Sequence, residues 1–236
     1  MTLSDPVLDA IRAHAAQVFP RECCGVLVVA HGKHKYFPCR NLAGGHEHFV
    51  LDPEGWAAAE DAGTPILVVH SHPNLPPVPS QADLVGCEQS GLPWMILSWP
   101  TGTTHFFEPS GYEAPLVGRQ FSYGILDCFT LIQDYYRRNL GIELKTPYRP
   151  DEWWLKGGNL YVDSADEWGF DRVETPARHD VLLMQVASPV PNHAALWLGD
   201  GTILHHQMGR LSSRDVYGGW YRKITTHVYR HRELPC

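Results

Sequence analysis

His70-Ser71-His72-Pro73, followed at short intervals by Ser80 and Asp83, is the most informative segment of this 236-residue chain. The apolar residues 66–69 directly before it predict a buried strand, in which side chains two positions apart point to the same side. His70 and His72 should therefore converge. Ser80 suits the N-cap of a helix, which would place Asp83 in the first turn, facing back toward them. Two His nitrogens and a carboxylate oxygen match the ligands of a hydrolytic zinc site, whose fourth position holds water.

The surrounding residues predict a mixed α/β domain at about residues 1–111. Periodic apolar residues predict helices over 5–18 and 80–89. Apolar runs predict strands over residues 25–29, 34–38, 66–69 and 94–99. Glu22 directly precedes the first of these strands, and we predict that its carboxylate activates the water molecule.

Glu22, the His70-Ser71-His72-Pro73 segment, Ser80 and Asp83 together resemble the motif of JAMM/MPN+ metallopeptidases. The motif extends over most of the first domain, so the resemblance implies a JAMM/MPN-like fold there. It also implies that His70, His72 and Asp83 bind one Zn²⁺ and that Glu22 acts as general acid and base. Ser80 would donate to the oxyanion as charge develops.

The bulk composition limits the classes of function. The net charge of −7 argues against a nucleic-acid surface, which needs clustered Lys and Arg. The chain has no apolar run of the ~18 residues that a membrane span requires, and its first residues lack a secretory signal. We therefore expect neither a membrane span nor export by a signal peptide. The six cysteines show no C-x-x-C spacing, which is typical of a chain made in a reducing cytosol.

A segment rich in Pro and Gly, residues 108–115, precedes a second predicted domain at about residues 116–236. There we predict a helix over 127–140 and strands over 181–186, 194–198 and 202–206. A helix followed by an antiparallel sheet is an α+β arrangement. Cys128 lies at the start of the helix, where the positive end of the helix dipole favours a thiolate. His193 lies at the start of the second strand and is the candidate base.

The length of the loop between the last two strands determines which later histidine can orient His193. A two-residue loop would place His206 opposite Ala195, whereas the three-residue loop Gly199-Asp200-Gly201 would place His205 there. Ala195 lies on the same strand face as His193. The residues themselves leave both alternatives open.

The second domain resembles the NlpC-type, papain-like cysteine peptidases that cut peptidoglycan stem peptides. The resemblance rests on Asp127-Cys128 at the helix start and on the segment from His193 through Gly199-Asp200-Gly201 to His205. It implies Cys128 as nucleophile and His193 as base. It implies His205 as the orienting residue, because the family's third residue usually lies twelve positions after its first histidine.

This chain departs from many members of that family directly after the cysteine, where Phe129-Thr130 replaces Ser-Gly. The departure bears on the substrate rather than on the nucleophile. Family members also often carry a tyrosine upstream of the cysteine that assists the oxyanion, and Tyr123 is the candidate here.

The order of the two domains resembles that of the tail assembly protein K family of lambda-like phages and their prophage relatives. The resemblance implies a protein of the host bacterial cytoplasm during assembly and of the virion tail tip afterwards, with other tail-tip proteins as partners. The second domain would open peptidoglycan for DNA entry, and the first would cleave another peptide bond. The alternative is a structural tail-tip component in which one or both sites are inactive and zinc is a structural staple.

Overall fold

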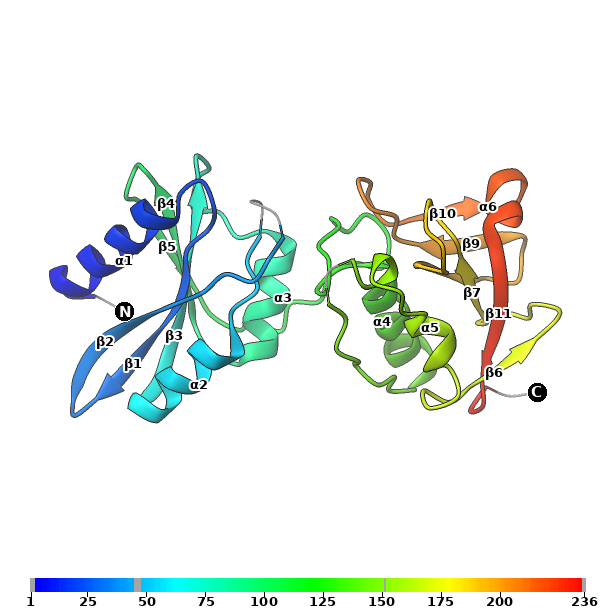
Figure 1. Cartoon of the computed structure of the whole chain (residues 1–236), viewed down its shortest axis with the longest axis horizontal. Coiled ribbons are helices and arrows are strands. Elements are labelled where there is room, and N and C mark those ends of the chain that lie inside the picture. Colours follow the sequence, from blue (N-terminus) through cyan, green and yellow to red (C-terminus); the bar gives the residue numbers. More distant parts are fainter. Residues whose placement is uncertain (1–2, 45–47, 151, 235–236) are drawn as a thin grey trace. The chain divides into compact units, whose positions relative to one another are not determined.

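The computed structural model describes residues 3–44, 48–150 and 152–234. The chain divides into two compact units, Met1–Glu113 and Ala114–Cys236 (Figure 1). Each unit has its own sheet and its own buried apolar clusters. Among the described residues, no helix combines the length and the hydropathy that crossing a membrane requires.

The strands of the first unit are β1 (Cys24–Ala30), β2 (Lys33–Cys39), β3 (Thr64–Pro73), β4 (Trp94–Trp99) and β5 (Thr104–Phe107). They form a sheet in the order β2-β1-β3-β4-β5. β3 and β4 are parallel, and the other neighbouring strands are antiparallel. The four predicted strands lie within β1 to β4, and β3 continues past His70 to Pro73.

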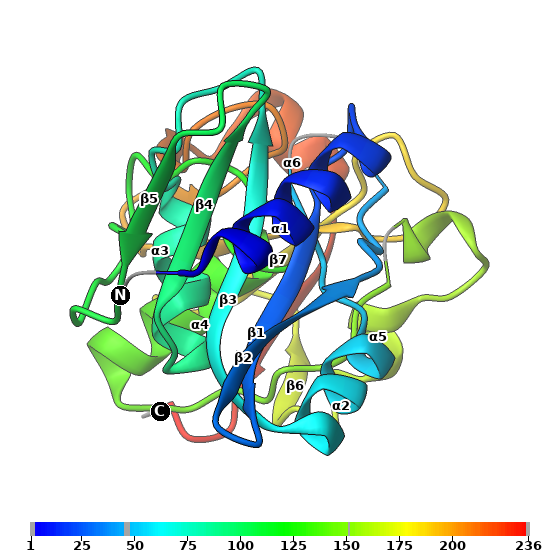
Figure 2. The same cartoon turned by 90° about the vertical axis from the view of Figure 1, so that its left-hand side faces the viewer.

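Helices cover both faces of this sheet (Figure 2). They are α1 (Asp5–Val18), α2 (Pro53–Ala62) and α3 (Gln81–Ser90). α1 buries Val7, Ile11 and Ala15, spaced about one helical turn apart, against one face. On the opposite face, Ala59 of α2 and Cys87 of α3 belong to apolar clusters with residues of the sheet. The mixed sheet with helices confirms the α/β class predicted for this part of the chain.

The strands of the second unit are β6 (Phe170–Val173), β7 (Val181–Met184), β8 (His193–Trp197), β9 (Thr202–His205), β10 (Ser213–Val216) and β11 (Thr225–His231). They form an antiparallel sheet in the order β10-β9-β8-β7-β11-β6. The helix α4 (Cys128–Leu140) buries Phe129, Ile132 and Tyr136 in one apolar cluster with Leu183 and Leu196 of the sheet. The shorter helices are η1 (Trp153–Leu155), α5 (Leu160–Asp163) and α6 (Gly219–Ile224). This arrangement confirms the predicted α+β class.

The prediction did not include the helices α2, η1, α5 and α6 or the strands β6, β10 and β11. β6 and β10 are four residues long and lie at the two edges of the sheet. Edge strands of this kind carry polar residues on their exposed side and show no apolar run. Their pairing with β11 and β9, rather than their local sequence, makes them strands.

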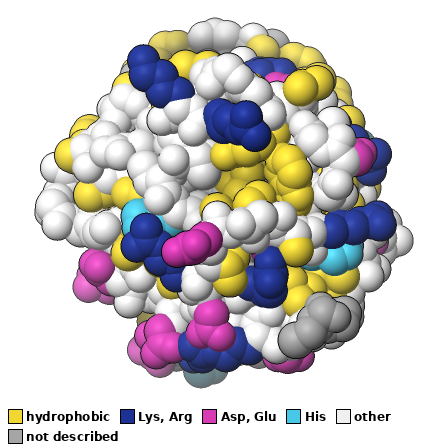
Figure 3. Space-filling model, turned by 90° about the vertical axis from the view of Figure 1, so that its right-hand side faces the viewer, with side chains coloured by type: hydrophobic (Ala, Val, Ile, Leu, Met, Phe, Trp, Pro, Cys, Tyr) yellow, Lys and Arg dark blue, Asp and Glu magenta, His cyan; other side chains and the backbone are white. Residues whose placement is uncertain are grey.

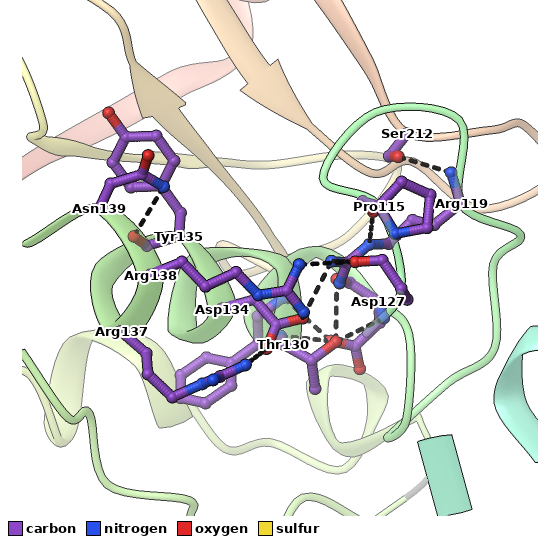
Figure 4. A network of polar contacts seen from close by, with 12 residues as sticks. Pro115, Arg119, Asp127, Thr130, Asp134, Tyr135, Arg137, Arg138, Asn139 and Ser212 are labelled. Carbon is purple, nitrogen blue, oxygen red and sulfur yellow. Dashed lines mark hydrogen bonds and ion pairs between the residues drawn. The ribbon is translucent and has the colours of Figure 1, made fainter. Parts of the chain in front are cut away.

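A partly buried ion pair attaches the beginning of the second unit to α4 (Figure 4). The fully buried guanidinium of Arg119 lies 2.9 Å from the Asp134 carboxylate. Arg119 Nε donates to the Pro115 carbonyl at 2.7 Å, and Arg138 donates to the Ala114 carbonyl at 2.7 Å. These contacts attach residues 114 and 115 to the second unit. The unit therefore begins two residues before the boundary expected at residue 116.

Apolar side chains gather near the middle of the side of the second unit that is seen in Figure 3. Basic, acidic and His side chains are scattered around them, and those drawn in this view form no continuous basic patch. Large exposed apolar residues of this unit include Met208, Leu211, Val216 and Trp220.

Candidate active sites

The three predicted metal ligands of the first unit meet between β3 and α3. His70 and His72 lie on β3, and Asp83 lies in the first turn of α3. Ser80 is the N-cap of α3: its hydroxyl accepts from the Asp83 backbone N–H at 3.1 Å. The Asp83 carboxylate in turn accepts from the Ser80 backbone N–H at 2.7 Å. This capping box holds the carboxylate of Asp83 at the start of the helix, facing the histidines.

The donor atoms of these residues have the spacing of a zinc site. His70 Nε2 lies 3.2 Å from His72 Nε2 and 3.2 Å from Asp83 Oδ1. His72 Nε2 lies 3.5 Å from Asp83 Oδ2, and all three side chains are buried. Around a tetrahedral zinc with bonds of about 2.0–2.1 Å, neighbouring ligand atoms are about 3.3 Å apart. The distances and the chemistry of this donor set therefore fit a zinc ion.

Neighbouring groups set the orientation of the two imidazole rings. His72 Nδ1 lies 3.2 Å from the Pro76 carbonyl, which can only accept, so Nδ1 carries the proton and Nε2 is left to bind a metal. The His70 ring stacks on Phe49 with 4.7 Å between ring centroids and meets Trp94 edge-on at 5.5 Å. Both rings are thus fixed by contacts outside the ligand set.

Glu22 reaches this cluster because β1 pairs with β3. The pairing continues past the end of β1, where the Ser71 N–H donates to the Cys23 carbonyl at 3.1 Å, so Glu22 comes next to His72. Burial raises the pKa of Glu22 to about 7, although the nearby His70 and His72 act to lower it. A carboxyl group with a pKa near neutrality can both accept and donate a proton.

The charge of Asp83 and the free proton of Ser80 also suit a hydrolytic site. Burial acts to raise the pKa of Asp83, but His70, with hydrogen bonds from His72 and Ser80, holds that pKa well below its usual range. Asp83 is therefore ionised, as a metal-binding carboxylate must be. Because the Ser80 hydroxyl accepts from Asp83, its own proton is left to donate to another group.

In the second unit, Asp127 is the N-cap of α4, the helix that begins with Cys128. Its Oδ1 accepts from the backbone N–H groups of Phe129 and Thr130 at 2.9 Å and 3.0 Å. Its Oδ2 accepts from the buried Arg149 guanidinium at 2.8 Å. Asp127 thus caps α4 and, through the same carboxylate, holds Arg149 of the segment that follows the helix.

The Cys128 side chain, 6% exposed, lies next to the strand that carries His193. Its sulfur lies against the backbone of Ala194, the residue after His193. The sulfur also lies 3.9 Å from the hydroxyl of Tyr161, a residue that sequence reasoning missed. Tyr161 comes from α5, 33 residues after Cys128, so no local spacing marks it.

β8 and β9 pair in the register of the three-residue loop. Ala195 lies opposite His205. Gly199 and Gly201 have φ angles of 87° and 81°, which glycine adopts without a steric penalty. The register brings His193 Nε2 to 3.1 Å from His205 Nδ1, so the other ring nitrogen of His193 is the one left for a nucleophile.

Two other candidate residues have different surroundings. The His206 ring is fully buried and meets Phe121 edge-on, with 5.1 Å between the ring centroids. The Tyr123 hydroxyl donates to the Pro150 carbonyl at 3.1 Å. The structure thus pairs His205, not His206, with His193, and Tyr161 rather than Tyr123 contacts the thiol.

Asp215 extends this line of side chains beyond His205, and sequence reasoning missed it. Its Oδ2 lies 3.1 Å from His205 Nε2. Asp215 belongs to β10 and pairs with Ile203, two positions before His205 on β9. Because the contact depends on which strand pairs with β9, the local sequence Ser-Arg-Asp-Val carries no sign of it.

Burial acts against the thiolate predicted for a cysteine at a helix N-terminus. Burial, with a smaller contribution from Asp127, raises the pKa of Cys128 to about 11. Burial, with a smaller contribution from His205, lowers the pKa of His193 to about 3. Burial therefore favours the neutral thiol and the neutral imidazole, because desolvation disfavours both charged forms.

We expect the alkylation of Cys128 by iodoacetamide to accelerate about tenfold per pH unit between about pH 6 and 9, because only the thiolate reacts. The rate is measured by mass spectrometry as the labelling of the peptide that contains residue 128. The same peptide from a Cys128→Ala chain gives the background, which is subtracted. A rate that is constant below about pH 8 would instead indicate a preformed thiolate–imidazolium pair.

Both units match known family models. The Prok-JAB model, described as prokaryotic homologs of the JAB domain, matches residues 4–109, and the NlpC/P60 family model matches residues 118–230. A solution structure of a protein from Desulfitobacterium hafniense is 28% identical, covers 44% of this chain and 78% of that one, and has a TM-score of 0.38. The crystal structure of a JAB1/MPN domain protein from Archaeoglobus fulgidus is 21% identical, covers 49% and 95%, and has a TM-score of 0.33.

Two phage proteins are similar over most of the chain. The tail tip assembly protein K of Escherichia phage N15 is 44% identical over 232 residues, which cover 96% of this chain and 95% of that protein. The tail tip assembly protein K of Escherichia phage lambda is 41% identical over 184 residues, which cover 77% and 89%. With a JAB domain followed by an NlpC/P60 domain, this chain belongs to the tail tip assembly protein K family of phages.

Proposed function

We propose that this chain is a phage tail-tip protein with two sites for peptide-bond hydrolysis. The second unit cuts peptidoglycan stem peptides through Cys128, and the first is a zinc-dependent peptidase with a different substrate. The observation that carries the proposal is the contact of His193 Nε2 with His205 Nδ1 at 3.1 Å, on the strand that lies beside the Cys128 sulfur. That arrangement leaves a neutral imidazole nitrogen to serve as base.

In the cysteine site, His193 Nδ1 takes the proton of the Cys128 thiol as the sulfur attacks the peptide carbonyl. The tetrahedral intermediate collapses when His193 returns that proton to the leaving amine, and a thioester remains on Cys128. Water, deprotonated by the same imidazole, then releases the acid and restores the thiol. His205 keeps the His193 ring in place through both steps.

In the first unit, His70, His72 and Asp83 would hold the zinc. When bound, a zinc ion polarises a carbonyl and lowers the pKa of water. Glu22 takes a proton from the attacking water and passes it to the leaving amine, a double role that its raised pKa supports. The Ser80 hydroxyl donates to the oxygen on which negative charge develops.

We also propose where this chain acts. The relatives are named as tail tip assembly proteins, which supports other tail-tip proteins as partners of this chain. We infer that it is present in the host cytoplasm during assembly and in the virion tail tip afterwards. Peptidoglycan would meet the second unit when the tail reaches the cell wall.

The test is the incubation of the full chain with purified peptidoglycan sacculi from Escherichia. We expect the turbidity to fall and mass spectrometry to find new amino termini within the released stem peptides. Release of new reducing sugar ends without new amino termini would identify a glycosidase instead. Sacculi that stay turbid and release no peptide would contradict the peptidoglycan substrate.

A further inference from the structure

Asp215 lies behind His205 and forms the third member of a line that begins at His193. His205 contacts His193 through Nδ1 at 3.1 Å and Asp215 through Nε2, also at 3.1 Å. His205 is almost fully buried, and the Tyr221 hydroxyl, 3.4 Å from Nε2, is a further neighbour of that nitrogen. The line crosses three neighbouring strands, β8, β9 and β10.

The carboxylate of Asp215 is surrounded by donors. The Tyr221 hydroxyl donates to Oδ2 at 2.6 Å, and the Ser213 hydroxyl donates to Oδ1 at 3.0 Å. The guanidinium of Arg210 lies 3.1 Å from Oδ2. Burial acts to raise the pKa of Asp215, but the hydrogen bonds from Tyr221 and His205 outweigh it, and that pKa is about 2. Asp215 is therefore ionised and can only accept.

The contacts of Asp215 and His205 determine which nitrogen of each imidazole ring carries the proton. Because Asp215 only accepts, His205 Nε2 must carry the proton of that contact. A neutral imidazole has a single ring proton, so His205 Nδ1 accepts. The proton between the two rings then belongs to His193 Nε2. His193 Nδ1 is consequently unprotonated, which is the state that a base toward a thiol requires.

We propose that Asp215 is a positioning residue that fixes the ring protons of His205 and His193, so that His193 presents an unprotonated Nδ1 to Cys128. Tyr221 supports it by holding Oδ2 of the carboxylate. The inference rests on the proposed function, in which Cys128 is the nucleophile and His193 the base.

The first test measures the ring protons in the unaltered chain, so it does not depend on any variant folding. Long-range ¹H–¹⁵N NMR spectra of the histidine rings distinguish protonated from unprotonated nitrogens, and His193→Gln and His205→Asn chains assign the signals. We expect the proton on Nε2 of both rings near neutral pH. A proton on Nδ1 of His193 would overturn the proposal.

The second test is an Asp215→Asn chain assayed on dye-labelled peptidoglycan sacculi. The amide has one accepting oxygen where the carboxylate has two, so it holds the proton on His205 Nε2 less firmly, and we expect part of the population to reverse the ring protons. Amide replacement of a carboxylate that directly contacts a catalytic histidine costs about 10⁴-fold in kcat. Because Asp215 acts one ring further away, we expect kcat to fall about 10- to 100-fold with KM unchanged. The NMR signals of His193 should show the Nδ1-protonated form appearing in the same chain.

The controls separate this effect from loss of charge and from misfolding. Asp171→Asn removes an exposed carboxylate from β6, at the opposite edge of the sheet, and should leave kcat unchanged. Asp215→Glu keeps the acceptor and should recover part of the rate. If Cys128→Ala abolishes hydrolysis while Asp215→Asn keeps its rate within about twofold, the positioning role is wrong and the proposed function stands. If the Cys128→Ala chain still hydrolyses peptidoglycan, the proposed function itself is wrong.

Discussion

A Cys128→Ala chain should clear purified peptidoglycan sacculi at least ~10³-fold more slowly than the unaltered chain, because no other group can form the covalent intermediate. The sulfur is the only heavy atom removed. The cap of α4 is made by Asp127 through backbone groups and does not depend on the thiol. The thermal unfolding midpoint should therefore stay close to that of the unaltered chain.

Cys87→Ala is the matched control for this experiment. Cys87 is also buried, but it lies on α3 of the first unit, where its thiol donates to the Leu92 carbonyl. Clearing should be unaffected by Cys87→Ala. If Cys128→Ala clears sacculi at the unaltered rate, the nucleophile of the second unit is not Cys128, and the zinc site becomes the candidate for cell-wall cutting. A Cys128→Ala, Glu22→Gln chain tests that directly.

Glu22→Gln should separate zinc binding from catalysis in the first unit. Glu22 is not among the proposed ligands, so the variant should still bind one zinc ion per chain, measured by elemental mass spectrometry after dialysis. Its activity should fall by about 10²- to 10⁴-fold, because the amide cannot accept the proton of the attacking water. The readout is the yield of infectious particles when the variant is supplied to a phage that lacks this protein.

Asp83→Asn completes this experiment. An amide is a much poorer zinc ligand than a carboxylate, so bound zinc should fall well below one ion per chain. Glu60→Gln, an exposed carboxyl on α2, is the control and should change neither zinc nor yield. If Glu22→Gln chains give a full yield while Asp83→Asn chains give none, the zinc is a structural staple, as the alternative reading of this protein holds.

The meeting of His70, His72 and Asp83 could be predicted because the signals that place these residues are local. Ser80 and Asp83 form a capping box within one helical turn, and the spacing of His70 and His72 in a strand places them on one face. The approach of Glu22 is less local. It follows from the pairing of β1 with β3, across more than forty residues of chain.

The cysteine site was only partly predictable. Cys128 at a helix start and His193 at a strand start are visible in the sequence, and the two classes of fold followed from apolar patterns. The effect of burial on the thiol was not visible in the sequence. Burial of the sulfur opposes the thiolate that the dipole of α4 favours, and it depends on which residues pack over the sulfur.

The sequence by itself therefore determined which residue types are available: a His-His-Asp set with a nearby Glu, a cysteine at a helix start, and histidines in a hairpin. Only the tertiary structure chose among them. The hairpin register selected His205 over His206, and the pairing of β10 with β9 added Asp215. The physical reason is that a strand register is a cooperative property of the whole sheet, and a shift of one residue turns every side chain to the other face.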